Sequence, residues 1–156
     1  MKATENPITD TPEFRALSVN AQWVFFAALQ EGPRRCGIVD LWPKRIAKTA
    51  IDTTEEDVVT GAAELDRAGV AYFDPETDEL LLPGYLGEIT NVNNPRMMIA
   101  AVNSVVGVVS HRLVGMVVTE LQQLREQAPQ ASVWNDPRVV ELMARPAVEL
   151  APLAGN

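Results

Sequence analysis

The stretch from Ile51 to Leu82 restricts the possible folds of this chain more than any other segment. Thr53 is followed three residues later by Glu56, a spacing typical of a capping box, in which a hydroxyl and a carboxylate each bind a free backbone N–H at a helix start. An apolar stripe at helical spacing follows, formed by Val58, Ala62 and Leu65. Gly69 then supplies the residue type that ends a helix in a left-handed turn. The pattern predicts a helix over residues 54–68.

Two short strand-like runs follow this helix, over residues 70–73 and 79–82. The loop between them is rich in aspartate and contains Pro75, so the two runs are predicted to pair as a hairpin. Residues 37–39 form a third strand candidate, which would lie beside the hairpin. A helix that ends in a hairpin is the helix-plus-wing unit of winged-helix domains. The predicted fold class is therefore mainly α with a small β-hairpin.

The segment before this unit supplies the rest of a winged helix-turn-helix. Ser18 is a good N-cap for a helix over residues 19–30, which is apolar nearly all round and is expected at the centre of the core. Pro43 suits the first turn of a second helix, which leads through a turn at residues 50–53 into the helix described above. The predicted order is helix, strand, helix, turn, helix and hairpin.

A helical hairpin extension is predicted after the wing, with helices over residues 95–109 and 111–127 and Ser110 as the cap of the second. Polar residues such as Asn103 and Arg112 interrupt its apolar run, which argues against a membrane span. The pair either covers the core or forms a dimer interface. The residues assigned to the dimer interface are Ala100, Ser104, Gly107, Val114, Val117 and Leu121.

The predicted organisation has four parts. Residues 1–11 form a flexible arm, residues 12–88 the winged-helix domain, residues 93–128 the helical extension and residues 129–156 a tail. The Asp136-Pro137 pair begins one short helix in the tail, which ends before Pro146, and the final ten residues are expected to be frayed.

The composition is that of a globular chain with a net charge of −8, and 47% of its 156 residues are apolar. The single cysteine, Cys36, excludes an intramolecular disulfide and fits a reducing compartment. Its neighbour Arg35 would lower the pKa of the thiol. The first seven residues lack the apolar run of a signal peptide, so a cytoplasmic protein is expected.

The charges are separated along the chain. Residues 34–48 hold five basic residues against one acid, whereas residues 52–88 hold eleven acids against one base. The basic cluster and the two threonines at the following turn are the candidate DNA contacts: Arg34, Arg35, Lys44, Arg45, Lys48, Thr53 and Thr54. In a helix-turn-helix the first helix crosses the DNA backbone, so Lys44 and Lys48 would bind phosphates from one helical face. The alternative is that these side chains are ordinary solvated charges.

Acids occupy the start of the predicted recognition helix. Glu55, Glu56 and Asp57 lie at the end that normally enters the major groove, where each carboxylate would repel a phosphate. The same carboxylates also complement the helix dipole, which requires no ligand.

Three blocks together resemble a known family. They are residues 14–26, Glu64-Leu65-Asp66-Arg67 leading into residues 74–81, and Asn94-Pro95-Arg96 with residues 100–104. Over residues 12–125 the chain resembles small winged-helix, replication-initiation-like proteins of actinobacterial phages and prophages. This resemblance implies DNA binding in phage replication or regulation. The chain departs from the family after the wing, where residues 83–88 carry no positive charge, and a wing contact to phosphate is therefore in question.

The sequence contains no phosphate-binding loop, nucleophile motif or metal-ligand spacing, so neither enzyme activity nor a cofactor is expected. The first hypothesis is a non-enzymatic protein that binds double-stranded DNA, acts in replication or transcription regulation and forms a homodimer. The second is an acidic protein-interaction module, which binds a host or phage replication protein and in one version mimics DNA. The distribution of the two charges over the folded surface distinguishes these hypotheses.

Overall fold

The computed structural model describes residues 7–153 and is mainly helical, with one small antiparallel sheet. This confirms the predicted class of helices with a small β-hairpin. In chain order the elements are η1 (Pro7–Asp10), α1 (Pro12–Arg15), α2 (Val19–Glu31), β1 (Ile38–Asp40), α3 (Pro43–Ala47), α4 (Glu55–Arg67), β2 (Tyr72–Asp74), β3 (Glu79–Leu81), α5 (Tyr85–Ile89), α6 (Pro95–Asn103), α7 (His111–Gln127), η2 (Ser132–Asn135) and α8 (Pro137–Met143).

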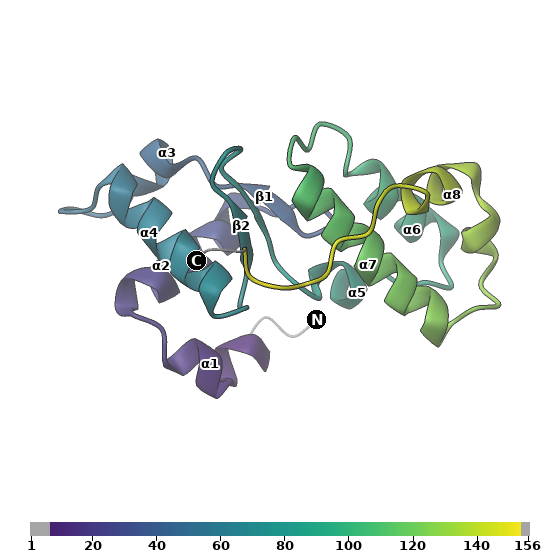
Figure 1. Ribbon diagram of the computed structural model, residues 1–156, viewed down its shortest axis with the longest axis horizontal. Helices are drawn as coiled ribbons and strands as arrows, with labels where there is room; N and C mark the ends of the chain where they lie inside the picture. The colour runs from purple at the N-terminus through teal and green to yellow at the C-terminus, as the bar shows by residue number, and fades with distance from the viewer. Residues whose placement is uncertain (1–6, 154–156) are drawn as a thin grey trace.

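The sheet lies between two layers of helices, as Figure 1 shows. Its strand order is β1-β3-β2, and Leu81 in the central strand pairs with Ile38 on one side and Tyr72 on the other. Successive strand residues face opposite sides. Ile38, Tyr72 and Leu81 enter a core with α6 and α7, while their neighbours Val39, Phe73 and Leu80 enter a core with α2 and α4. Both faces of the sheet are therefore buried.

The first core is built around the packing of α2 on α4. Gly61 allows the two helices to approach closely, because a Cβ at this position would lie 2.7 Å from Cγ2 of Val24. Polar contacts fix the crossing: Asn20 Nδ2 donates to the carbonyl of Asp57 at 2.8 Å, and Glu64 accepts from the backbone N–H and the hydroxyl of Ser18. The same Ser18 hydroxyl caps α2, as predicted.

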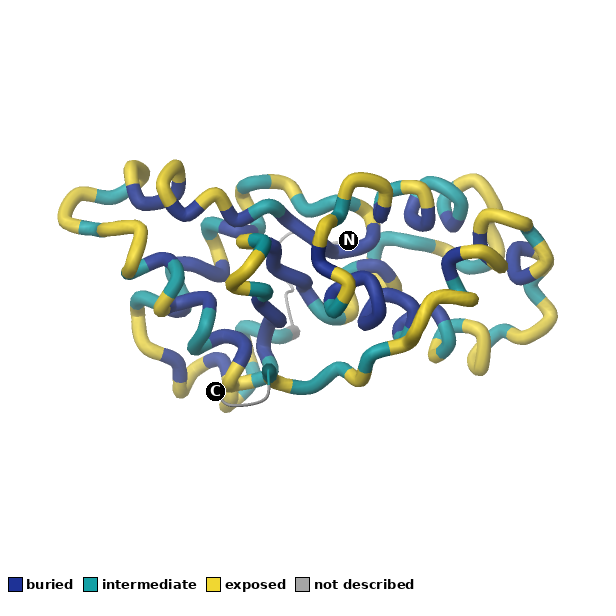
Figure 2. The backbone as a smooth tube through the Cα atoms, turned by 45° about the horizontal axis from the view of Figure 1, so that its top comes forward, coloured by how far each residue is buried: buried dark blue, intermediate teal, exposed yellow. Residues whose placement is uncertain are grey.

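The second core is built around the first half of α7, in which residues 113–118, 120 and 121 are buried. In Figure 2 the buried backbone lies mainly in the interior of the molecule and the exposed backbone along its outline. Ser110 caps α7 by accepting from the N–H of Leu113, and the helix runs over the predicted residues. The preceding helix α6 is shorter than predicted. It ends at Asn103, and residues 104–107 form turns that include Gly107 at a φ of +89°.

The residues after α8 form an ordered strap, which we define as residues 146–153. In Figure 1 this segment crosses in front of α7 and reaches the side of β2. The backbone N–H of Val148 donates to Gly115 O, the Thr119 hydroxyl donates to Val148 O at 2.7 Å, and the Tyr72 hydroxyl donates to Leu150 O. The prediction of a frayed end is therefore wrong for the described part of the last ten residues, and residues 154–156 lie outside it.

The strap packs directly against Gly115 of α7. A Cβ at Gly115 would lie 2.4 Å from Cγ2 of Val148 and 2.9 Å from the carbonyl oxygen of Pro146. We expect Gly115→Ala to lower the free energy of unfolding by about 1–3 kcal/mol, the usual cost of overpacking. Hydrogen exchange of the Val148 amide should become faster. Gly87→Ala in α5 is the control, because its Cβ would meet only Leu124 at 3.7 Å. Equal stability of the two variants would contradict this account of the strap.

Several predicted boundaries are corrected by the local hydrogen bonds. The capping box is formed by Thr54 and Asp57, not by Thr53 and Glu56, so the helix starts one residue later than the spacing suggested. The helix from Pro43 ends at Ala47. Of the arm predicted to be flexible, residues 1–6 lie outside the described range, and residues 7–10 form η1. Two short helices, α1 and α5, were not predicted.

Candidate functional site

A groove of about 480 Å³ opens between α3, the start of α4, the loop of the β2–β3 hairpin and the turn between α6 and α7. Figure 1 shows α3, the hairpin and the α6–α7 turn along one edge of the molecule. The groove therefore lies between the two layers of helices, at the end of the sheet that carries the hairpin loop. Its lining residues are Arg34, Asp40, Trp42, Pro43, Lys44, Glu55, Val59, Thr77, Asp78, Glu79, Gly107 and Val109.

Trp42 forms an exposed aromatic wall of the groove. Its side chain is 59% exposed, and its backbone is left-handed at a φ of +47°, a conformation that costs on the order of 1–3 kcal/mol in a non-glycine residue. Hydrogen bonds on both sides hold it there. The N–H of Leu41 donates to Asp78 O, and the carbonyl of Trp42 accepts from the N–H groups of Arg45 and Ile46 in α3.

Two acidic residues form part of the groove's rim. Glu55 is the first residue of α4, and Asp78 ends the hairpin loop at a φ of +56°. Burial raises the pKa of Asp78, and the neighbouring negative charges of Glu55 and then Asp74 raise it further. The proximity of these charges makes the rim a place where a cation is stabilised and a phosphate is repelled.

Two side chains that line the groove each have a buried polar atom without a hydrogen-bond partner. Arg34 Nη2 donates to Asp40 Oδ2 at 3.2 Å, but Arg34 Nη1 has no partner among the described residues, and neither has the Thr77 hydroxyl. Buried donors without partners are rare, because each costs about 1–3 kcal/mol. Both atoms are closed to solvent, so they offer no contact to a ligand in the groove.

The buried carboxylate of Glu79 holds in place the side of the groove that Val109 forms. This side chain is only 2% exposed, and it accepts from the N–H of Val109 at 3.0 Å and from the N–H of Ser110 at 2.7 Å. Both donors lie at the start of α7, where a negative charge also complements the helix dipole. The contact holds Val109 at the groove with its side chain exposed.

The predicted DNA contacts differ in the partners that they have within the chain. The Thr53 hydroxyl donates to the carbonyls of Ala47 and Ala50, and the Thr54 hydroxyl is the N-cap of α4, so both threonines stabilise the helix-turn-helix corner. Arg34 pairs with Asp40, and Arg45 pairs with Glu31. Arg35, Lys44 and Lys48 are exposed and make no ion pair with any described residue.

The dimer contacts predicted on α7 are corrected. Val114, Val117 and Leu121 are completely buried in the chain's own second core, so they pack internally and are closed to a partner. Ser104 is engaged by accepting from the N–H of Cys36 at 2.9 Å and donating to Ala101 O. Of the remaining two positions, Ala100 is half-buried, and Gly107 lines the groove.

Cys36 is not a reactive thiol. Its side chain is completely buried, and burial raises the pKa of the thiol despite the nearby charge of Arg34. The pKa depression expected from Arg35 is therefore wrong, because desolvation outweighs a neighbouring charge at this depth.

Within residues 7–153, no three histidine, cysteine, aspartate or glutamate side chains gather closely enough to hold a metal ion. In the same range no helix combines the length and apolar character that crossing a bilayer requires. Comparison of the chain with protein-family models, curated proteins and solved structures gave no match.

Sequence reasoning missed the groove residues Trp42, Asp78 and Val109. Trp42 precedes Pro43, and a residue before proline normally favours an extended backbone, so its left-handed conformation leaves no local signal. Asp78 and Val109 come from distant segments, and the contact that brings these segments together joins residues 30 positions apart, Val109 N–H donating to Glu79. The sequence offers one signal for this site, which is the position of the aromatic residue Trp42 between a predicted strand and a predicted helix.

Proposed function

We propose that this chain is a non-enzymatic winged-helix module that binds a protein partner through an acidic face. This face consists of Glu55, Glu56, Asp74, Glu76 and Asp78. The order α2, β1, α3, α4 and the β2–β3 hairpin, with β1 beside the hairpin in one sheet, supports the winged-helix assignment. The resemblance to phage and prophage proteins suggests a role in replication or regulation inside the cell, with a host or phage replication protein as partner.

The observation that carries this proposal is the charge on the surface that would read DNA. In a helix-turn-helix protein the N-terminal residues of the second helix contact the base edges. Here Glu55 and Glu56 are exposed at that end of α4, and Glu76 and Asp78 are exposed on the hairpin loop. Each carboxylate would repel a phosphate, and Arg34 and Arg45 are already neutralised by acids of this chain. A positively charged protein surface is the complementary partner.

A second candidate function is the binding of double-stranded DNA. It is favoured by the same order of elements and by Lys44 and Lys48, which are exposed on and just after α3 without an ion pair to any described residue. In this alternative α3 binds phosphates and the acidic face points away from the duplex.

A titration with a fluorescent 20-base-pair duplex at 50 mM and 200 mM salt separates the two functions. We expect no saturable binding by the natural chain at either salt concentration. Neutralising the acidic face with Glu55→Gln, Glu56→Gln, Glu76→Gln and Asp78→Asn should create weak, salt-sensitive binding, because the remaining lysines then face the phosphates unopposed.

The control is the matched variant Lys44→Ala, Arg45→Ala and Lys48→Ala in the neutralised background, which should lose that binding. If the natural chain binds the duplex at 50 mM salt and the lysine variant does not, the DNA function is correct and the protein-binding proposal is wrong.

A further inference from the structure

We infer that the groove beside Trp42 binds a segment of the partner protein that carries an arginine side chain. This inference rests on the proposed function, because it assigns the chemistry of the partner that the acidic face binds. The arginine would stack on the Trp42 indole and place its guanidinium group between Glu55 and Asp78.

The groove combines apolar and acidic side chains around one opening. Trp42 is 59% exposed and Val109 is 67% exposed, and both line the groove from different segments. Glu55 and Asp78 stand beside them, close enough for the charge of Glu55 to raise the pKa of Asp78. Arginine matches both features, since its planar guanidinium stacks on aromatic rings and binds carboxylates in a bidentate manner.

The net charge of the groove also favours a cationic ligand. Arg34 is paired with Asp40, and Glu79 is satisfied by the backbone N–H groups of Val109 and Ser110. The lining holds two basic residues, Arg34 and Lys44, and four acidic ones, Asp40, Glu55, Asp78 and Glu79, so its formal net charge is two negative units. It therefore fits one cationic side chain and disfavours a phosphate.

The test uses a fluorescein-labelled peptide, Gly-Leu-Arg-Leu-Gly-amide, and measures its anisotropy with the full chain. We expect saturable binding that weakens about tenfold when citrulline replaces arginine, because citrulline keeps the shape and loses the charge. Trp42→Ala and Asp78→Asn should each weaken binding about tenfold as well. Glu126→Gln is the control, because Glu126 is exposed on α7 and lies outside both the groove lining and the acidic face, and it should change the affinity less than twofold.

Trp42→Phe keeps a stacking surface and should retain most of the affinity, and it provides a second variant if Trp42→Ala does not fold by circular dichroism. The inference is overturned if the peptide does not bind, if citrulline binds equally well, or if Trp42→Ala and Asp78→Asn bind as the natural chain does. It is also overturned if the chain self-associates and Trp42→Ala abolishes this, since the occupant is then a second copy. These failures leave the duplex titration unchanged, so they are distinct from a failure of the proposed function.

Discussion

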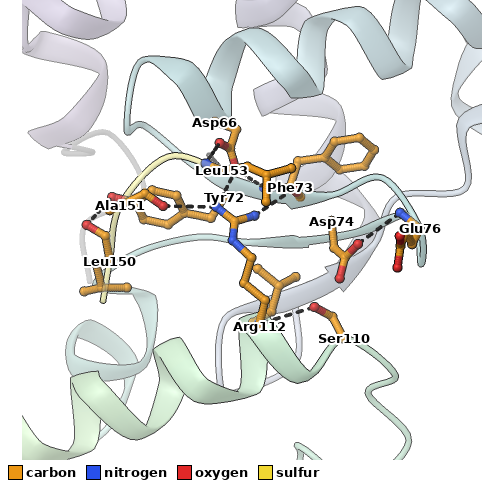
Figure 3. A network of polar contacts seen from close by, with 11 residues as sticks. Asp66, Tyr72, Phe73, Asp74, Glu76, Ser110, Arg112, Leu150, Ala151 and Leu153 are labelled. Atoms are coloured by element: carbon orange, nitrogen blue, oxygen red, sulfur yellow. Dashed lines mark hydrogen bonds and ion pairs between the residues drawn. The ribbon is translucent and has the colours of Figure 1, made fainter. Parts of the chain in front are cut away.

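Replacing Arg112 with alanine is expected to lower the free energy of unfolding by about 3–5 kcal/mol, the range seen when one partner of a buried ion pair is removed. Arg112 extends from α7 to Asp66 on α4, with Nη2 at 2.9 Å from Asp66 Oδ2 (Figure 3). Asp66 is only 1% exposed, so its carboxylate would be left buried without its counter-charge. Chemical denaturation followed by circular dichroism measures the loss.

The large effect is expected because Arg112 joins four segments. Its guanidinium also donates to Phe73 O in β2 and to Ala151 O in the strap, while Asp66 accepts from the N–H groups of Phe73 and Leu153 (Figure 3). Arg138→Ala is the control, because Arg138 is exposed and, among the described residues, pairs only with Asp136 at the start of its own helix. Similar denaturation midpoints for the two variants would show that the buried network contributes nothing.

The double variant Asp66→Ala with Arg112→Ala provides a further check. Removing both charges leaves no unpaired ion in the core, so the double variant should be more stable than the sum of the two single losses predicts. Strict additivity would indicate that the two side chains act independently.

A pH dependence centred on Glu120 is the second large effect that we expect. Burial raises the pKa of Glu120 from 4.5 to about 7, and the N–H of Gly84, which donates to Oε2 at 2.7 Å, opposes this only in part. Its Oε1 is buried and has no hydrogen-bond partner among the described residues. The folded chain therefore holds this proton more tightly than the unfolded chain does.

The sign of the effect follows from that difference in proton affinity. The contribution of Glu120 to stability is fully present below about pH 4.5 and is lost as the pH rises to about 7, so the free energy of unfolding falls over this range. The size is on the order of 3 kcal/mol, from about 2.5 pKa units at 1.36 kcal/mol each.

Glu120→Gln should remove most of this slope and should be more stable than the natural chain at pH 8. Glu126→Gln, an exposed position on the same helix, is the control and should leave the slope unchanged. Denaturation curves at pH 5, 6, 7 and 8 make the comparison. A natural chain that gains stability between pH 5 and pH 7 while the Glu120→Gln variant does not would contradict the raised pKa.

Local signals predicted the helices well. Ser18, Ser110 and Asp136 each cap the helix that they were expected to cap, and Gly69 takes the left-handed conformation at a φ of +70°. These features depend on neighbouring residues alone, so the sequence contains them directly. The strap was missed for the opposite reason. Its contacts reach residues 29 to 87 positions away, and its alanine- and proline-rich sequence has no periodicity.

The candidate site was predictable only in its charges. The acids of α4 and of the hairpin loop lie on the surface as their spacing suggested, but the basic cluster is partly neutralised by Glu31 and Asp40. Counting charges along a sequence does not show which side chains meet in the fold. The groove depends on the turn before α7, whose position is set by the long-range contact between Glu79 and Ser110.

The burial of both faces of the sheet means that this chain does not divide at residue 88. A fragment containing only residues 12–88 would leave Ile38, Tyr72 and Leu81 facing water, a bare apolar surface that invites aggregation. The parts of the chain before and after residue 88 are therefore expected to fold and unfold together. A partner that binds the β2–β3 hairpin therefore binds an element that packs directly on α7.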